Sequence, residues 1–308
     1  MRQSFLKFYK SHEVAIIMLS RFILMIIALV SINKAIGMST TISNIWTILT
    51  LAVIAMFLRS SAIVTISMFV IVYHLSGISL ILAGIVAAVC IATYVMYIRL
   101  FPRESIVILF TMLLLPIDAV YVVPLVSALF FGVSAIVAIA CGCIFYYMFC
   151  QLPIMVGSNQ ISGFSLDALE IVVNNLLRNT FFNTEILTII TILSVVFLMV
   201  YIIRLQAIDY ANYVAVCVGG VISTLGFLIS QLLLHTRVSI TLMLLMTIVS
   251  VIIASFIAFL SIVLDYSRAE HVQFEDENNF YYVKVVPKIE LHEQTQTTQV
   301  FGGTENHF

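Results

Sequence analysis

The chain has 308 residues, of which 62% are hydrophobic and 9% charged, with a mean hydropathy of +1.16. A soluble domain has roughly 45 to 50% apolar and about 25% charged residues, so this composition excludes a water-facing globular protein. Residues 1–264 contain 11 Lys and Arg against 7 Asp and Glu, a net charge of +4, whereas residues 265–308 contain 3 against 8, a net charge of −5. We therefore predict a multi-span transmembrane domain at 1–264, in contact with the lipid bilayer, and an acidic cytoplasmic tail at 265–308.

A membrane-spanning helix needs about 20 mostly apolar residues, and several runs reach or approach that length. They are 14–33, 43–58, 62–76, 78–98, 105–149, 186–203, 211–234 and 238–264. The first run contains Arg21 and no cleavage site follows it, so we expect a retained helix and not a signal peptide. The pattern predicts an all-α polytopic membrane protein with about eight spans, one of them broken or re-entrant.

The run from Ser105 to Phe149 is too long for one span. Its 45 residues include one charged side chain, Asp118, and would make about 68 Å of helix, which suffices for two crossings of a bilayer core. Pro116 and Pro124 lie on either side of Asp118 and prevent a regular helix from continuing. We therefore predict a break near the middle of this run.

Lys and Arg are enriched in short cytoplasmic loops, and this rule sets the predicted topology. It places the N-terminus, Arg59 and the pair Arg99 and Arg103 on the cytoplasmic side, together with Arg204 and the tail. An odd number of crossings must then lie between 105 and 149. This favours a re-entrant hairpin at about 105–131 followed by a span at 132–149. The alternative is two ordinary spans, which would place the acidic tail outside.

Two polar connections are predicted to lie at the membrane surface. Residues 164–182 have apolar side chains at helical spacing, with Asp167 and Arg178 among the polar residues opposite and Ser165 as a helix cap, which is typical of an interfacial amphipathic helix. The loop 204–211 contains Asp209, either a cap for the next helix or a contact for a docking partner.

Small residues at regular spacing predict two faces for close contact between helices. One face consists of Gly84, Ala88 and Ala92. The other consists of Gly219, Ser223, Gly226 and Ser230. Helix packing within the bundle accounts for both patterns.

Arg21 and Asp118 are the ionisable residues that lie inside predicted spans. Such a charge costs about 2.5 to 3.5 kcal/mol at mid-bilayer, which makes both residues candidates for a transport pathway or an intramembrane pair. Arg21 can also extend to the interface, and Asp118 can simply cap a turn. The sequence has no metal-ligand spacing, no catalytic dyad and no phosphate-binding loop, so we expect no catalysis, metal, cofactor or nucleic-acid partner.

The tail combines an acidic cluster with a strand-like segment. Glu275, Asp276 and Glu277 precede residues 278–288, which are rich in aromatic and β-branched side chains and end near a proline. A lone strand is not stable in water, so it must pair within this chain or with another protein. We take the acidic cluster together with Tyr281, Tyr282 and Val283 as candidate docking residues for a cytoplasmic partner.

Five short stretches are similar to one group of proteins. The tail sequences that begin at Asp265 (DYSR), Val272 (VQFEDE), Tyr281 (YYVK) and Val286 (VPK), and the loop sequence IDYA at Ile208, resemble uncharacterised bacterial multi-pass membrane proteins that are sometimes labelled permeases. The resemblance implies a permease-like transport component of the cell membrane. The alternative is a non-catalytic scaffold that recruits a cytoplasmic or envelope-assembly partner through its tail, or that associates with copies of itself.

Overall fold

The structure, a computed structural model, describes residues 2–35, 40–77, 80–157, 174, 178, 183–206, 210–234, 239–267, 270–276 and 279–285. The first half of the described chain is helical. Its elements are α1 (Arg2–Ala35), α2 (Thr40–Ser43), α3 (Ile45–Phe57), α4 (Ser60–Ser76), α5 (Leu80–Thr93) and a π-helical turn, η1 (Tyr94–Ile98). Arg59 joins α3 to α4 in an extended conformation.

The predicted break in the run 105–149 is confirmed. Its elements are α6 (Ile106–Leu114), a 3₁₀ turn η2 (Leu115–Ile117), α7 (Val122–Phe130) and α8 (Ala135–Gly157). The described chain continues with α10 (Thr184–Arg204), α11 (Ala211–Leu234), α12 (Ile240–Ser267) and the strands β1 (Glu270–Asp276) and β2 (Asn279–Val285).

Among the described residues, four helices are long and apolar enough to cross a membrane: Val14–Lys34, Thr184–Arg204, Ala211–Leu233 and Ile240–Leu260. Only 22 to 39% of each apolar window is buried inside the protein, so most of their hydrophobic surface faces outward. Large exposed apolar patches are rare on soluble proteins and mark membrane contact. The structure thus supports a helical membrane protein. The shorter apolar helices coincide with the remaining predicted spans, and the count of eight stays a prediction.

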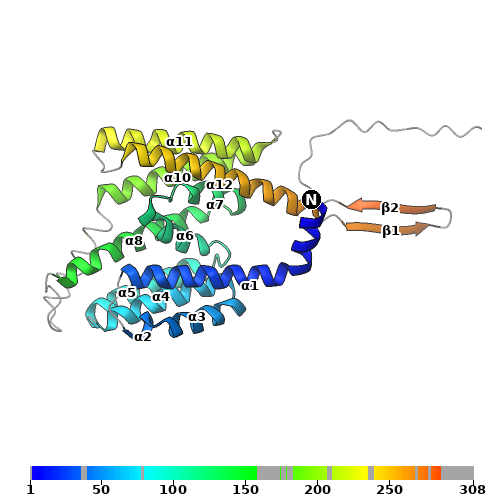
Figure 1. Cartoon of the computed structure of the whole chain (residues 1–308). Coiled ribbons are helices and arrows are strands. Elements are labelled where there is room, and N and C mark those ends of the chain that lie inside the picture. The colour runs from blue at the N-terminus through cyan, green and yellow to red at the C-terminus, as the bar shows by residue number, and fades with distance from the viewer. Residues whose placement is uncertain are drawn as a thin grey trace, which may run out of the picture.

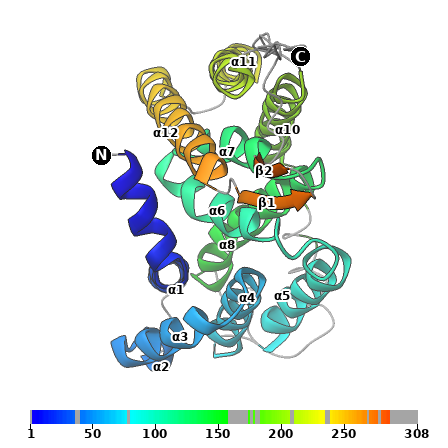
Figure 2. The same ribbon diagram turned by 90° about the vertical axis from the view of Figure 1, so that its right-hand side faces the viewer.

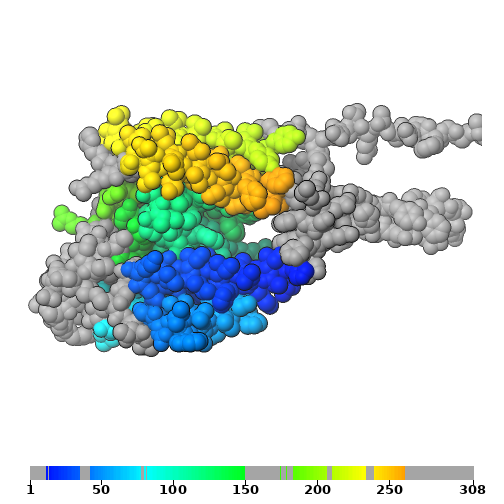
Figure 3. All heavy atoms as spheres, viewed as in Figure 1, coloured from blue at the N-terminus to red at the C-terminus, as the bar shows by residue number. Residues whose placement is uncertain are grey.

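The helices form three groups (Figures 1 and 2). The group α1, α3, α4 and α5 lies on one side, and the group α10, α11 and α12 lies on the other. Between them lie α6, α7 and α8: α6 contacts α4 and α8, whereas α7 contacts α10 and α12. The space-filling view shows the same green central layer between the blue and the yellow helices (Figure 3). The short helices that contain the break are therefore internal to the molecule.

Glycines mark the closest helix contacts. A Cβ added at Gly142 of α8 would lie 2.5 Å from Thr111 Cβ and 2.8 Å from the carbonyl oxygen of Ile108, both on α6. The predicted face of α11 is confirmed as a packing face, because an added Cβ at Gly219 would clash with Val200 of α10 and Leu125 of α7.

The prediction that the small-residue face of α5 packs against another helix of this chain was wrong. Gly84, Ala88 and Ala92 are exposed, and no atom lies within 4 Å of a Cβ added at Gly84. Spacing alone could not separate the two faces, because small residues indicate where a helix can approach closely and not which helix is its neighbour.

The strand predicted at 278–288 includes β2, which pairs antiparallel with β1 of the same chain. The register places Val272 opposite Val283 and Phe274 opposite Tyr281. The strand therefore has its partner within the chain. The amphipathic helix predicted at 164–182 lies outside the described residues, apart from Asn174 and Arg178, as do Asp209 and Glu277.

Replacing Gly142 with alanine should destabilise the protein by about 1 to 3 kcal/mol, because the new methyl group overpacks the α6–α8 contact. The matched control is Gly84→Ala, which should be neutral or stabilising by up to about 1 kcal/mol, since alanine favours the helix and meets open space. Thermal unfolding in detergent measures the stability of both variants. It is monitored by the reaction of the buried thiols of Cys90 and Cys143 with a fluorogenic reagent. Equal melting temperatures for the two variants would contradict this packing.

Candidate functional site

The chain changes direction at Asp118, between η2 and α7. Asp118 adopts a left-handed conformation, with φ 54° and ψ 20°. Its N–H donates to the carbonyl of Leu115 at 3.2 Å, and the N–H of Ala119 donates to that of Leu114 at 3.0 Å, which satisfies two carbonyls at the end of the helix. Aspartate tolerates this conformation better than most residues. Pro124 lies in the first turn of α7, where a missing N–H leaves no helical bond unmade.

The start of α6 and the end of α7 lie at the same end of the bundle. The hydroxyl of Tyr97, in η1, lies 3.0 Å from the carbonyl oxygen of Ser134 and 3.2 Å from Glu104 Oε2. Glu104 comes just before α6, and Ser134 comes just before α8. Since α6 and α8 start at the same level, and also meet further along at Gly142, they run in the same direction. Helix α7 must therefore return the chain to its starting level, and we call residues 106–130 the broken hairpin.

Each arm of the broken hairpin is too short to cross a membrane. Helices α6 and α7 have nine residues each, or about 14 Å of helix, against a hydrocarbon core of about 30 Å. Helix α8 has 23 residues, or about 34 Å, and its part within this run, Ala135–Phe149, is one of the shorter apolar helices. The run 105–149 thus provides a short hairpin followed by the first part of α8.

Arg204 caps the second arm of the broken hairpin. Its Nη1 donates to the carbonyl oxygen of Ala128 at 2.8 Å, across 76 residues of sequence. Ala128 lies in the last turn of α7, where carbonyls have no helical partner and the helix end carries partial negative charge. The guanidinium of Arg204, at the last residue of α10, therefore satisfies this carbonyl and stabilises the end of α7. Sequence analysis assigned Arg204 only a topological role, because no local pattern indicates that these helix ends meet.

The tip of the broken hairpin rests against α11. The ring of Tyr121, which is buried, meets Phe227 edge to face with their centroids 5.0 Å apart. Asp118 itself is exposed, and so is Ile117 beside it. In an apolar bundle, this places a carboxylate at a turn whose surface is not covered by the described protein.

The structure shows no ion pair between Asp118 and Arg21 within the described part of the chain. Arg21 Nε is buried and has no hydrogen-bond partner there. The pairing of these two residues therefore stays a prediction. A polar pair that sequence analysis missed joins α1 to α4: His74 is fully buried, and its Nε2 lies 2.8 Å from Asn33 Oδ1. The two residues are 41 positions apart, and no local pattern in the sequence predicted this contact.

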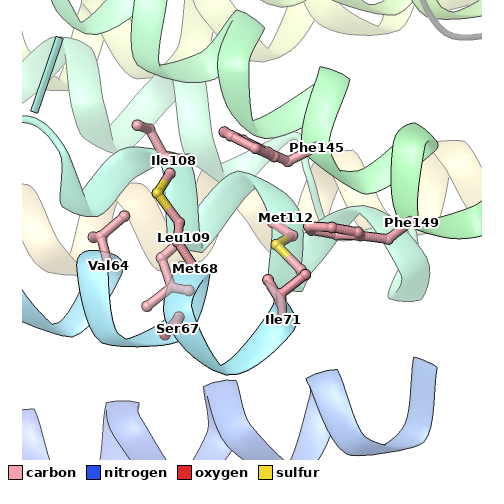
Figure 4. Close-up of a pocket in the computed structure, with 9 residues that line it drawn as sticks. All are labelled: Val64, Ser67, Met68, Ile71, Ile108, Leu109, Met112, Phe145 and Phe149. Atoms are coloured by element: carbon pink, nitrogen blue, oxygen red, sulfur yellow. The ribbon is translucent and has the colours of Figure 1, made fainter. Parts of the chain in front are cut away.

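A small apolar crevice lies where α4, α6 and α8 meet (Figure 4). Its cavity volume is about 10 Å³, which is at the lower limit for one water molecule. Its lining includes Met68, Met112 and Phe145, and the one polar side chain, Ser67, donates its hydroxyl proton to the carbonyl of Ile63. The crevice is too small and too apolar to hold a polar solute.

Five of the six candidate docking residues of the tail lie on the two strands. Glu275 and Asp276 are in β1, and Tyr281, Tyr282 and Val283 are in β2, whereas Glu277 lies outside the described residues. The five are remote in sequence from the broken hairpin. Comparison of the chain with protein-family models, with curated proteins and with solved structures finds no match.

Replacing Arg204 with glutamine should lower the free energy of unfolding by about 1.5 to 3 kcal/mol, because the carbonyl of Ala128 loses a charged donor. Arg99→Gln is the matched control, since Arg99 is exposed at the end of η1. Arg204→Lys keeps the positive charge at the end of α7 and should recover part of the loss. Thermal unfolding in detergent measures all three, and equal stability of the two glutamine variants would rule out the cap.

Proposed function

We propose that the chain is a multi-pass protein of the cell membrane and acts as a permease-like component of a transport system. The observation that carries this proposal is the broken hairpin, which lies in the central layer and has the carboxylate of Asp118 exposed at its turn. Transporters bind substrates and coupling ions at helices that are interrupted near the middle of the membrane. A bundle with a purely structural role could be built from continuous helices, without such a turn in its interior.

The proposed membrane arrangement has eight crossings and one re-entrant hairpin. Helices α1, α3, α4, α8, α10, α11 and α12 cross once each, and α5 crosses together with η1. The broken hairpin enters and leaves on the cytoplasmic side. Two observations support that side: the hairpin starts just after Arg99 and Arg103, and its far end is capped by Arg204. An even number of crossings puts both the N-terminus and the tail in the cytoplasm.

We further propose that the turn at Asp118 faces a water-filled cavity. Irregular backbone at membrane depth needs cover from protein or water, and a carboxylate exposed to lipid is costly. Asp118 and Ile117 are exposed on the described protein, so protein does not cover them. Water is the remaining environment that satisfies both groups.

A cysteine at Ile117 should therefore react with a charged, membrane-impermeant thiol reagent. The five native cysteines are first replaced by alanine. Phe69→Cys is the matched control, because Phe69 is 75% exposed and Ile117 58% exposed, but Phe69 lies inside the continuous apolar helix α4. We expect labelling at 117 and none at 69, read by mass shift in intact membranes. Absence of labelling at both positions would sink the proposed water-filled pathway.

A second candidate function is a scaffold that uses the tail. The observation that favours it is the hairpin β1–β2, whose register pairs Val272 with Val283 and Phe274 with Tyr281, alternate residues that share one face of a two-stranded sheet. An isolated two-stranded hairpin is marginally stable in water, so it gains from a partner that covers this face or extends an edge. The acidic residues Glu275 and Asp276 would keep it away from the anionic inner leaflet.

Replacing Val283 with proline should abolish the hairpin, because proline cannot donate to the strand ladder. The control is Val300→Pro, in the polar end of the tail. Hydrogen exchange of the tail amides should be slow in the wild type and in the control but fast in Val283→Pro. If the wild-type tail already exchanges freely, or cytoplasmic proteins that co-purify with it are unchanged by Val283→Pro, the scaffold function has no support.

A further inference from the structure

A group of oxygen atoms lies at the start of the broken hairpin. It consists of the Glu104 carboxylate, the Tyr97 hydroxyl, and the carbonyl and hydroxyl oxygens of Ser134, contributed by three different segments. Tyr97 is 4% exposed and Glu104 is half-buried. We call these groups the oxygen cluster.

The hydrogen bonds of the oxygen cluster do not balance. Two acceptors, Glu104 Oε2 at 3.2 Å and the Ser134 carbonyl at 3.0 Å, face the single O–H of Tyr97. One phenol proton fully satisfies one acceptor and not two. No ion pair to Glu104 is found among the residues described, so its negative charge is not neutralised there by Lys, Arg or His. A half-buried carboxylate with one shared donor is short of positive charge.

Space beside Gly132 adjoins the same carboxylate. A Cβ added at Gly132 would have two neighbours within 4 Å, and both are oxygens: Glu104 Oε1 at 3.5 Å and Ser134 Oγ at 3.7 Å. This position is therefore large enough for a methyl group and bordered by a carboxylate and a hydroxyl. At Gly142, by contrast, an added Cβ would clash with Thr111 and with the carbonyl oxygen of Ile108.

We propose that the oxygen cluster binds a sodium ion. The ion would take the carboxylate, carbonyl and hydroxyl oxygens as ligands, as coupling ions do at interrupted helices. This role as the coupling ion of transport rests on the proposed function, whereas the binding itself does not.

Three arginines lie in segments next to the oxygen cluster, but none of them forms an ion pair with Glu104 among the described residues. Arg99 and Arg103 are exposed in the same connection, and Arg204 donates to the carbonyl oxygen of Ala128 at the end of α7.

Thermal unfolding of the purified full-length protein tests this site without a transport assay. Sodium chloride is titrated against choline chloride at constant ionic strength and pH 8. We expect the melting temperature to rise with the sodium concentration. Glu104→Gln should abolish that rise, whereas Glu185→Gln, an exposed carboxylate at the start of α10, should keep it.

Two further variants keep the test decisive if Glu104→Gln does not fold. Tyr97→Phe removes one ligand oxygen and should weaken the apparent affinity about tenfold, the effect of losing one bond to a charged group. Gly132→Ala fills the space beside Glu104 without changing any charge and should weaken it several-fold. A melting temperature that is insensitive to sodium, or a response that these variants leave unchanged, would overturn the site. Neither result affects the labelling expected at position 117.

Discussion

Every backbone amide and carbonyl group inside a bilayer must find a hydrogen bond within the protein or with trapped water, and the arrangement of this molecule follows from that constraint. A continuous helix satisfies it without help. The broken hairpin cannot, because it adds four helix ends to the interior of the bundle. The left-handed turn at Asp118 satisfies carbonyls at one of these ends, and Arg204 satisfies one at another. Helices α4, α10 and α12 then pack against the hairpin from both sides.

The central position of the hairpin explains which side chains surround it. Glycine appears where its arms need close backbone contact, at Gly142 against α6 and at Gly219 against α7. Polar groups appear where the chain is irregular, at Asp118 and at the connection that contains Glu104 and Ser134. The proposed pathway at the turn and the proposed cation site at the oxygen cluster thus lie at the two places where a regular helix is absent.

The sequence predicted the parts of this structure that depend on local chemistry. Pro116 and Pro124 predicted the break, and the run of aromatic and β-branched residues predicted β2. Contacts between distant segments could not be predicted from the sequence, because they depend on which helices become neighbours. Gly84 and Gly219 have the same local pattern, yet one is exposed and the other is packed. Likewise, nothing near Arg204, Glu104 or His74 in the sequence names Ala128, Ser134 or Asn33 as a partner.

The partners of the broken hairpin also determine when it can fold. The first arm, α6, packs against α4, which precedes it, but other partners of the hairpin come later in the chain: Gly142 in α8, Arg204 in α10, and Gly219 and Phe227 in α11. A chain made from its N-terminus therefore completes the second arm, α7, before the helices that hold it exist. This arm must wait for its partners until about a hundred further residues have been made. Truncation within α11 would consequently leave this central element unseated, even though its own sequence is intact.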